Sequence, residues 1–405
     1  MHNSDNNFSF DQSKLLPQEE MLEIAKKKKK LIIGVPKEQT IEENRIALTP
    51  HAVELLVENG HEVMIEKNAG IAARFEDIEY SEVGAQVTET HKEIFQCDII
   101  IKVAPFSIDE IEALKGGQVV ISSLQIATQE REYFKKLQEK KVTAIAFEYL
   151  KDSKNNIFPV IQSMSEIAGR ASIMIAAEYL SNAYDSKGEL IGGISGVSPT
   201  EVVILGAGTA GEFAARTALG LGAMVKVFDL SVYKLSHLQT RLGQRIFTSI
   251  LQPRVLRKAM KTADVVIGAM HMGEKGSTFV VSEEIIKNMK NRSVIVDIGI
   301  DHGGCFETSR LTTHKKPVFK KHGVIHYCIP NIASKVARTA SYALSNIFGI
   351  LLLNLGEAGG IKQYLKANYG VRNGVYIYKG IPTNEMIGNK FGFPSKDIDL
   401  LMAAF

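Results

Sequence analysis

Cysteine is scarce in this sequence and widely dispersed. The 405 residues include three cysteines, Cys97, Cys305 and Cys328. At this spacing they form neither the framework of a disulfide-rich domain nor the ligand set of a metal site. We therefore expect a protein that has no metal centre and works in a reducing compartment, the cytoplasm.

A large excess of charge is also missing. The net charge is +3, which argues against the concentrated basic surface of a nucleic-acid-binding protein. The first 20 residues are polar and lack the apolar core of a secretory signal. Five lysines follow at positions 26–30 and are typical of a solvated segment. We expect residues 1–30 to be a flexible N-terminal extension.

Long apolar runs are absent too. The longest apolar helix candidate, at 343–355, is interrupted by Ser345, Asn346, Gly349 and Asn354, and it is shorter than the roughly 20 residues that cross a bilayer. We therefore expect no membrane partner. The composition, 45% hydrophobic and 23% charged, is that of an ordinary globular protein, and the length allows two or three domains.

The most informative stretch is EVVILGAGTAGEFAARTALGLGAMVKVFD, residues 201–229. Its apolar start predicts a buried strand, followed by a glycine-rich turn with G-x-G-x-x-G spacing, an alanine-rich helix and a second strand that ends in an acid. The turn, the start of the helix and the acid comprise Gly206, Gly208, Thr209, Ala210, Gly211 and Asp229.

Each part of this stretch has a physical role in binding a dinucleotide. The glycines permit a tight turn, a close approach of the backbone to a pyrophosphate, and close packing of the helix on the sheet. The helix N-terminus presents unpaired N–H groups to the phosphates. Asp229 can accept a hydrogen bond from the ribose 2′-OH, and Leu230 and Ser231 follow it instead of an arginine. The pattern predicts NAD rather than NADP as the cofactor.

The rest of the chain alternates strands and helices, which predicts an α/β fold with parallel sheets. Strands are expected within 31–35, 61–66, 97–105, 117–125, 142–150, 263–271, 293–304 and 324–331. Long helices are expected at 163–180, capped by Ser163 or Ser165, and at 339–355. We expect a discontinuous first domain, 31–160 plus 340–405, and a nucleotide-binding domain at 161–339.

Polar residues follow several of these strands. Ligands of doubly wound sheets bind at the carboxyl ends of the strands, so His271, Asp301, His302 and Asn331 are expected near a cleft. Lys102 is the only charged residue inside the apolar segment 99–105. A buried lysine is costly, and its ammonium suits proton transfer or the stabilisation of a developing oxyanion.

Several stretches resemble one family in combination and in order. They are GVPKEQTIEENRIALTP (34–50), IIIKVAP (99–105), SMSEIAGR (163–170), GGISGVSPTEVVILGAGTAG (192–211), VIVDIGIDHGGCFETSR (294–310) and IPNIASKVARTASYALSN (329–346). These stretches resemble the alanine dehydrogenases and the related nucleotide-binding part of proton-pumping nicotinamide nucleotide transhydrogenase. The similarity to the alanine dehydrogenases is greater.

The resemblance implies two Rossmann-like domains, joined by long helices with a cleft between them. It also implies a homo-oligomer, hexameric or dimeric. The implied reaction is the reversible, NAD-dependent oxidative deamination of L-alanine to pyruvate and ammonium.

For the substrate, the resemblance implies that Arg45 binds the carboxylate and that Lys102 binds substrate and takes part in catalysis. Asp301 matches an active-site aspartate near the nicotinamide and the substrate amine. Gln125 stands where the family has a histidine regarded as the general acid/base. A glutamine can donate and accept hydrogen bonds but cannot exchange a proton near neutral pH. Three alternatives follow: Lys102 carries the proton alone, another group such as His302 replaces the histidine, or the activity is altered or weak.

For the cofactor, the resemblance adds a set of contacts beyond the glycine-rich turn. Asp301 also belongs to this set. The added residues are Ser165, Met270, His271, Ile298 and Asn331. Lys234 lies five residues past Asp229, where it could line the adenosine end or belong to a charged helix face.

The change at Gln125 keeps two other functions open. One is an NAD-dependent dehydrogenase for another 2-oxo acid or amine, similar to the saccharopine dehydrogenases. The other is a transhydrogenase-like NAD(H)-binding subunit.

Overall fold

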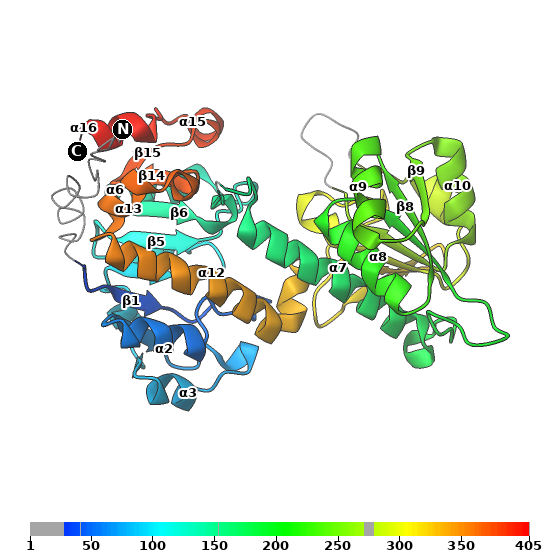
Figure 1. Ribbon diagram of the computed structural model, residues 1–405, viewed down its shortest axis with the longest axis horizontal. Helices are drawn as coiled ribbons and strands as arrows, with labels where there is room; N and C mark the ends of the chain where they lie inside the picture. The colour runs from blue at the N-terminus through cyan, green and yellow to red at the C-terminus, as the bar shows by residue number, and fades with distance from the viewer. Residues whose placement is uncertain (1–27, 41, 153, 271–278, 405) are drawn as a thin grey trace, which may run out of the picture.

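The chain folds into two lobes, each built on a central sheet (Figure 1). The computed structural model describes residues 28–404 except 41, 153 and 271–278. Most of the predicted N-terminal extension and His271 therefore lie outside the described residues. Both sheets are mainly parallel with helices on their two faces, so the predicted α/β class with two Rossmann-like folds is confirmed.

The first lobe contains an eight-stranded sheet in the order β15-β14-β6-β5-β4-β1-β2-β3. The strands from β6 to β3 are parallel, whereas β14 pairs antiparallel with both β6 and β15. Their bounds are β1 Ile32–Val35, β2 Glu62–Glu66, β3 Gln86–Thr88, β4 Ile99–Ile101, β5 Val119–Ser122, β6 Thr143–Ala146, β14 Val375–Tyr378 and β15 Ile381–Pro382.

The second lobe contains a seven-stranded sheet in the order β12-β13-β11-β10-β7-β8-β9. Its strands are parallel except for the antiparallel pair β12–β13. Their bounds are β7 Glu201–Leu205, β8 Met224–Asp229, β9 Phe247–Ile250, β10 Val265–Gly268, β11 Val294–Asp297, β12 Val318–Lys321 and β13 Val324–Tyr327.

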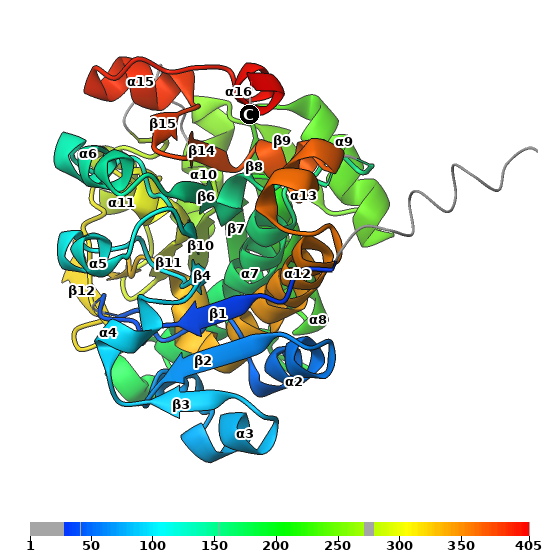
Figure 2. The ribbon, with the colours of Figure 1, turned by 90° about the vertical axis from the view of Figure 1, so that its left-hand side faces the viewer.

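Helices cover both faces of each sheet. In the first lobe α2 and α12 lie on one face and α5, α6 and α15 on the other (Figure 2). In the second lobe α7, α8 and α9 oppose α10 and α11. The α-helices are α2 Pro50–Glu58, α3 Asp77–Glu82, α4 His91–Ile94, α5 Ile108–Ala113, α6 Arg131–Glu139, α7 Pro159–Leu180, α8 Thr209–Gly220, α9 Val232–Leu242, α10 Pro253–Thr262, α11 Glu283–Lys287, α12 Ala337–Glu357, α13 Ile361–Ala367, α14 Tyr369–Arg372, α15 Glu385–Phe391 and α16 Ile398–Ala404.

Two long helices, α7 and α12, run between the lobes (Figure 1). Both were predicted, but the predicted cap of α7 at Ser163 or Ser165 is wrong. The helix begins at Pro159, with Phe158 in the capping position. Proline suits the first turn of a helix because the N–H that it lacks has no intrahelical partner there.

The segment Ile332–Glu357, which contains α12, is long and apolar enough to cross a membrane by length and composition, so the expectation of a run too short for this is wrong. Half of the apolar 18-residue stretch within it is buried inside the protein. Leu344, Phe348 and Leu352 have no exposed surface because they pack into the core of the first lobe. This packing accounts for the apolar character of α12.

Candidate active site

The predicted glycine-rich turn connects β7 to α8 in the second lobe. Gly206 has φ +112°, and a Cβ there would lie 2.4 Å from the carbonyl oxygen of Ala269. A Cβ on Gly211 would lie 1.9 Å from the carbonyl oxygen of Gly206. Glycine is therefore required at both positions, and Gly208 precedes the first residues of α8, Thr209 and Ala210. This backbone fits a pyrophosphate at the N-terminus of α8.

Asp229 ends β8 beside this turn. Its Oδ2 accepts a hydrogen bond from the backbone N–H of Ala207 at 2.8 Å, and its Oδ1 accepts one from Ser231 at 2.8 Å. The carboxylate therefore ties the glycine-rich turn to the start of α9, where Lys234 is exposed. Each carboxylate oxygen has a second lone pair, so Asp229 can still accept a bond from a ribose hydroxyl.

Arg45 lies in the loop after β1 and is held by Glu43. Glu43 Oε1 accepts from Arg45 Nε at 2.7 Å, and Glu43 Oε2 accepts from Arg45 Nη2 at 2.6 Å. Arg45 Nη1 lies 3.4 Å from Met164 Sδ on α7. Burial opposes the positive charge, but Glu43 outweighs it and raises the pKa of Arg45, with further contributions from Glu38 and Asp301.

Residues of the second lobe contact the pair formed by Arg45 and Glu43. Asn331 Nδ2 donates to Glu43 Oε2 at 2.8 Å, and the backbone N–H of Asn331 donates to Asp301 Oδ2 at 3.2 Å. Asn331 follows β13 with φ +56°, and Asp301 lies in the turn of 3₁₀-helix after β11. The structure thus brings together three predicted site residues, Arg45, Asp301 and Asn331, from strand ends in both sheets.

Lys102 follows β4 and is 1% exposed at its side chain. Its Nζ lies 2.7 and 2.9 Å from the two carboxylate oxygens of Glu110, and 3.6 Å from Glu38 Oε2. Burial raises the pKa of Glu38 to about 7, although Lys102 acts in the opposite direction. In this conformation the two acids, rather than solvent, surround the ammonium, and a substrate would have to replace one of these contacts.

Gln125 lies in the loop after β5 with φ +46°. Its side chain is exposed, and Nε2 is 3.4 Å from Ser123 Oγ. Glu148 Oε1 accepts the backbone N–H groups of Leu124 and Gln125 at 2.7 and 3.3 Å, and burial raises the pKa of Glu148. Ser123 Oγ donates to the carbonyl of Val103, which connects the Gln125 loop to the segment that carries Lys102.

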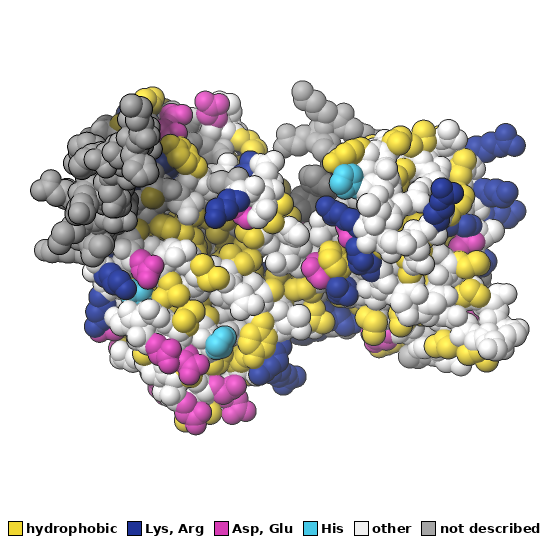
Figure 3. All heavy atoms as spheres, viewed as in Figure 1, with side chains coloured by type: hydrophobic (Ala, Val, Ile, Leu, Met, Phe, Trp, Pro, Cys, Tyr) yellow, Lys and Arg dark blue, Asp and Glu magenta, His cyan; other side chains and the backbone are white. Residues whose placement is uncertain are grey.

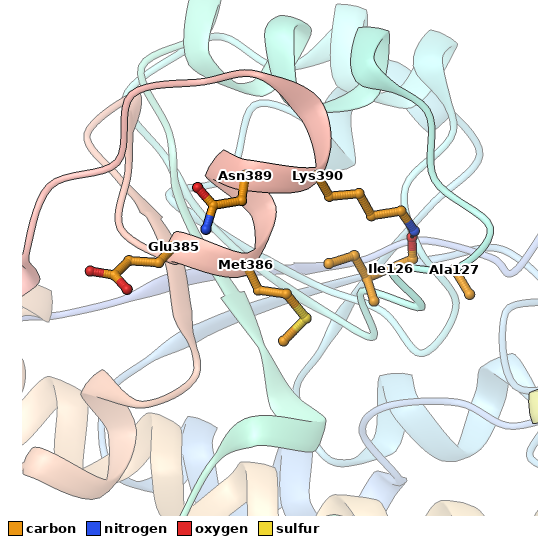
Figure 4. A pocket seen from close by; sticks show the side chains of 6 residues that line it. All are labelled: Ile126, Ala127, Glu385, Met386, Asn389 and Lys390. Atoms are coloured by element: carbon orange, nitrogen blue, oxygen red, sulfur yellow. The ribbon is translucent and has the colours of Figure 1, made fainter. Parts of the chain in front are cut away.

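Helix α15 covers the next part of the Gln125 loop. Lys390 Nζ donates to the carbonyl oxygen of Ile126 at 3.0 Å, and Figure 4 shows this side chain reaching from α15 towards the loop. The surface hollow between them is lined by Ile126, Ala127, Glu385, Met386, Asn389 and Lys390. The hollow is separate from the candidate site, because its lining does not include Arg45, Lys102, Asp301 or Asn331. We therefore interpret its residues as a support for the Gln125 loop.

Three other predicted cofactor residues lie on a helix and after two strands, and their contact with a cofactor stays a prediction. Ser165 is part of α7 beside Met164, and Ile298 begins the 3₁₀-turn that contains Asp301. Met270 follows β10, and its carbonyl oxygen lies 3.3 Å from Cys305 Sγ. His271 lies outside the described residues, so its predicted contact with cofactor stays a prediction.

Glu38, Glu43 and Glu110 were not predicted, although they hold the two predicted cations. The signal for Glu38 and Glu43 was available, because both precede Arg45 in the motif at 34–50 and a buried cation needs an acidic partner. Glu110 had a local signal only. It forms a capping box with Ser107 at the start of α5, a pattern that predicts a helix start and not a contact with Lys102.

Comparisons with known proteins agree on one family. The families described as "Alanine dehydrogenase/PNT, N-terminal domain" and "Alanine dehydrogenase/PNT, C-terminal domain" match residues 34–168 and 172–385. A curated alanine dehydrogenase from Methanococcus maripaludis is 40% identical over 366 residues, which cover 90% of this chain and 97% of that protein. One from Staphylococcus saprophyticus is 37% identical and covers 91% of this chain and 99% of its own length.

Solved structures give the same result. An L-alanine dehydrogenase superposes with a TM-score of 0.83 at 35% identity, covering 89% of this chain and 99% of its own. A transhydrogenase from Sinorhizobium meliloti has a TM-score of 0.74 at 24% identity, with 88% and 99% covered, and shares the fold. The predicted resemblance is confirmed, and the chain belongs to the alanine dehydrogenase/PNT family.

Proposed function

We propose that this protein is an NAD-dependent alanine dehydrogenase, which reversibly converts L-alanine, NAD⁺ and water into pyruvate, ammonium, NADH and a proton. The observation that carries the proposal is the joining of Arg45 to Asn331 through Glu43. A guanidinium suited to a carboxylate thereby lies beside the residues expected at the nicotinamide. The relatives named alanine dehydrogenase support the choice of substrate.

The cofactor fits the second lobe. The turn at Gly206 and Gly211 has no room for a Cβ, the N-terminus of α8 can receive the pyrophosphate, and Asp229 can accept from a ribose hydroxyl. Ser165, Met270, Ile298 and Asn331 complete the proposed contacts. When bound, NAD supplies the acceptor for the hydride that leaves C2 of alanine.

Arg45 and Asp301 orient the substrate in this proposal. Arg45 binds the substrate carboxylate, because its planar fork matches two carboxylate oxygens. Asp301 favours the ammonium group and orients the water that adds to C2 of the imine. Holding carboxylate and amine at once fixes C2 in one orientation, which is the entropic part of catalysis.

The proton that water loses needs a carrier, and Gln125 cannot be one. We assign this role to the pair of Lys102 and Glu38. Glu38 lies 3.6 Å from the lysine Nζ and has a pKa of about 7, so it can hold a proton near neutral pH. Gln125 then hydrogen-bonds the substrate oxygen and leaves proton transfer to the pair.

We further propose a homo-oligomer, hexameric or dimeric, in the cytoplasm. Figure 3 shows hydrophobic side chains on the visible face of both lobes. In the loop between α7 and β7, Leu190, Ile194 and Val197 are 65%, 67% and 58% exposed. Covering these side chains with a second copy would remove apolar surface from water.

Gln125 favours one second candidate, a dehydrogenase of the same fold that acts on another 2-oxo acid or amine. A substrate screen that follows NADH absorbance separates the two. We expect NADH to form from L-alanine with NAD, and to be consumed with pyruvate plus ammonium. Turnover of a different amino acid without turnover of alanine would support the second candidate instead.

A further inference from the structure

Glu43 has an unusual position for a residue outside the predicted site. Its side chain is 4% exposed, and each of its two carboxylate oxygens accepts two hydrogen bonds. Oε1 accepts from the backbone N–H and Nε of Arg45, at 3.0 and 2.7 Å. Oε2 accepts from Nη2 of Arg45 and from Nδ2 of Asn331, at 2.6 and 2.8 Å. One buried carboxylate therefore contacts side chains from both lobes.

The contact with Arg45 selects one edge of the guanidinium. Glu43 occupies the edge formed by Nε and Nη2, so the edge formed by Nη1 and Nη2 remains for a ligand. Nη1 contacts Met164 Sδ at 3.4 Å, and a thioether is a weak acceptor that a carboxylate can replace. Glu43 thus turns the arginine so that its second edge is available for a bidentate carboxylate.

The loop that carries Glu43 is attached to the start of the long helix between the lobes. The hydroxyls of three serines accept backbone N–H groups of the loop at 2.8, 2.9 and 2.9 Å, in the pairs Asn44 with Ser334, Ile46 with Ser341, and Thr49 with Ser345. Ser334 lies three residues after Asn331, and the other two serines lie on α12. A shift of Asn331 is therefore transmitted to Arg45 by both the carboxylate and the loop.

We propose that Glu43 is a positioning residue that couples the substrate arginine to the nicotinamide side of the site. The inference rests on the proposed function, since it assigns Arg45 to the substrate carboxylate and Asn331 to the cofactor. When the cofactor orders Asn331, Glu43 holds the guanidinium in the orientation that binds substrate. Binding of one ligand then strengthens binding of the other, and thermodynamic linkage makes this effect reciprocal.

Glu43→Gln tests the coupling, because it keeps the size of the side chain but removes the charge. We expect the KM for L-alanine to rise roughly 10- to 100-fold, the range for lost hydrogen bonds to a charged group, while kcat changes less. The coupling factor is measured without ammonium, so that no turnover occurs. The dissociation constant of NADH, followed by NADH fluorescence, is compared in the presence and absence of pyruvate, and linkage makes this ratio equal to the effect of NADH on pyruvate binding. NADH should tighten pyruvate binding in the wild type, and this factor should fall towards one in the variant.

Glu42→Gln is the matched control. Glu42 is the adjacent acid, and its Oε1 accepts from the backbone N–H of His314 in the second lobe at 2.6 Å, a bond that an amide oxygen preserves. This variant should keep both the KM and the coupling. Glu43→Asp keeps the charge and should recover part of the loss, and thermal unfolding with NADH shows that each variant folds.

The outcomes separate this inference from the proposed function. An unchanged KM and an unchanged coupling factor in Glu43→Gln would overturn the positioning role. A lower KM would overturn it too, because it would mean that Glu43 competes with the substrate for Arg45. A wild-type protein that does not turn over alanine would instead contradict the proposed function, on which the inference depends.

Discussion

At the scale of single residues, the candidate site contains two buried cations, Arg45 and Lys102. Each has an acidic partner within 3 Å, Glu43 for the arginine and Glu110 for the lysine. A buried charge without a partner is strongly unfavourable, so both cations need these acids for folding. In the proposed function the same pairs control which N–H groups a substrate can reach, so we expect stability and substrate binding to depend on the same side chains.

Glu38 should make the stability of the protein depend on pH. Its pKa rises from 4.5 in the unfolded chain to about 7 in the native state, mainly through burial. Between these values the native state holds a proton that the unfolded state has lost, so stability falls as pH rises through this window. We expect Glu38→Gln to remove up to about 3 kcal/mol of this fall, measured as the urea midpoint at a series of pH values.

An exposed acid on α2 provides the control for this measurement. Glu58→Gln should leave the pH dependence of the wild type in place. If Glu38→Gln and the wild type lost stability equally between pH 4.5 and 7, burial of Glu38 would not be the cause.

Candidate site residues could be predicted where they lie within a recognisable sequence motif. Arg45, Asp301 and Asn331 were named from sequence, and the structure brings them together. The pairing of Glu43 with Arg45 had a local signal, but its contact with Asn331 spans 288 residues, and no local pattern predicts that contact. The replacement of the family histidine by Gln125 was visible in the sequence, but the proximity of Glu38 to Lys102 was not.

At the scale of elements, the cofactor half depends on the close packing of α7 against α8. A Cβ on Gly169 of α7 would lie 2.2 Å from the carbonyl oxygen of Ala210 in the first turn of α8. We expect Gly169→Ala to destabilise the protein by roughly 1–3 kcal/mol through overpacking. It should also weaken NADH binding, because it displaces the helix N-terminus that we propose to receive the pyrophosphate. Thermal unfolding and NADH titration measure the two effects.

Gly220 on α8 serves as the control for this change. It is exposed, and nothing lies within 4 Å of a Cβ built there. Gly220→Ala should be neutral or stabilise the helix by up to about 1 kcal/mol, since alanine favours helix. Equal stability and equal NADH affinity in Gly169→Ala and the wild type would refute the packing argument.

Elements with strong periodicity were predicted, and weak ones were not. The apolar strands and the helices at 163–180 and 339–355 correspond to observed elements, with ends that differ by a few residues. The strand Phe247–Ile250 was missed because its residues are exposed or half-buried and lack a clear alternation. Helix α7 starts at Pro159 rather than at the predicted 163, because proline is suited to the first turn of a helix.

At the scale of the whole molecule, the two lobes are joined by the long helices α7 and α12 and by the contact between Glu43 and Asn331. Helix α12 begins six residues after Asn331 and then packs in the core of the first lobe (Figure 1). The α/β alternation predicted both sheets, and the resemblance predicted how they are joined. The contacts between the lobes join residues that are far apart in the chain, so only the structure reveals these contacts.

We propose that Arg45 and the nucleotide-binding lobe form one amino-acid dehydrogenase site. The most direct test compares kcat/KM for L-alanine, followed by NADH absorbance, in the wild type and in Arg45→Lys. Lysine keeps the charge but cannot form the bidentate pair. We predict turnover by the wild type, and a loss of roughly 100-fold in the variant with unchanged NADH affinity. Equal kcat/KM values in the two proteins, or no turnover of alanine by the wild type, would contradict the account.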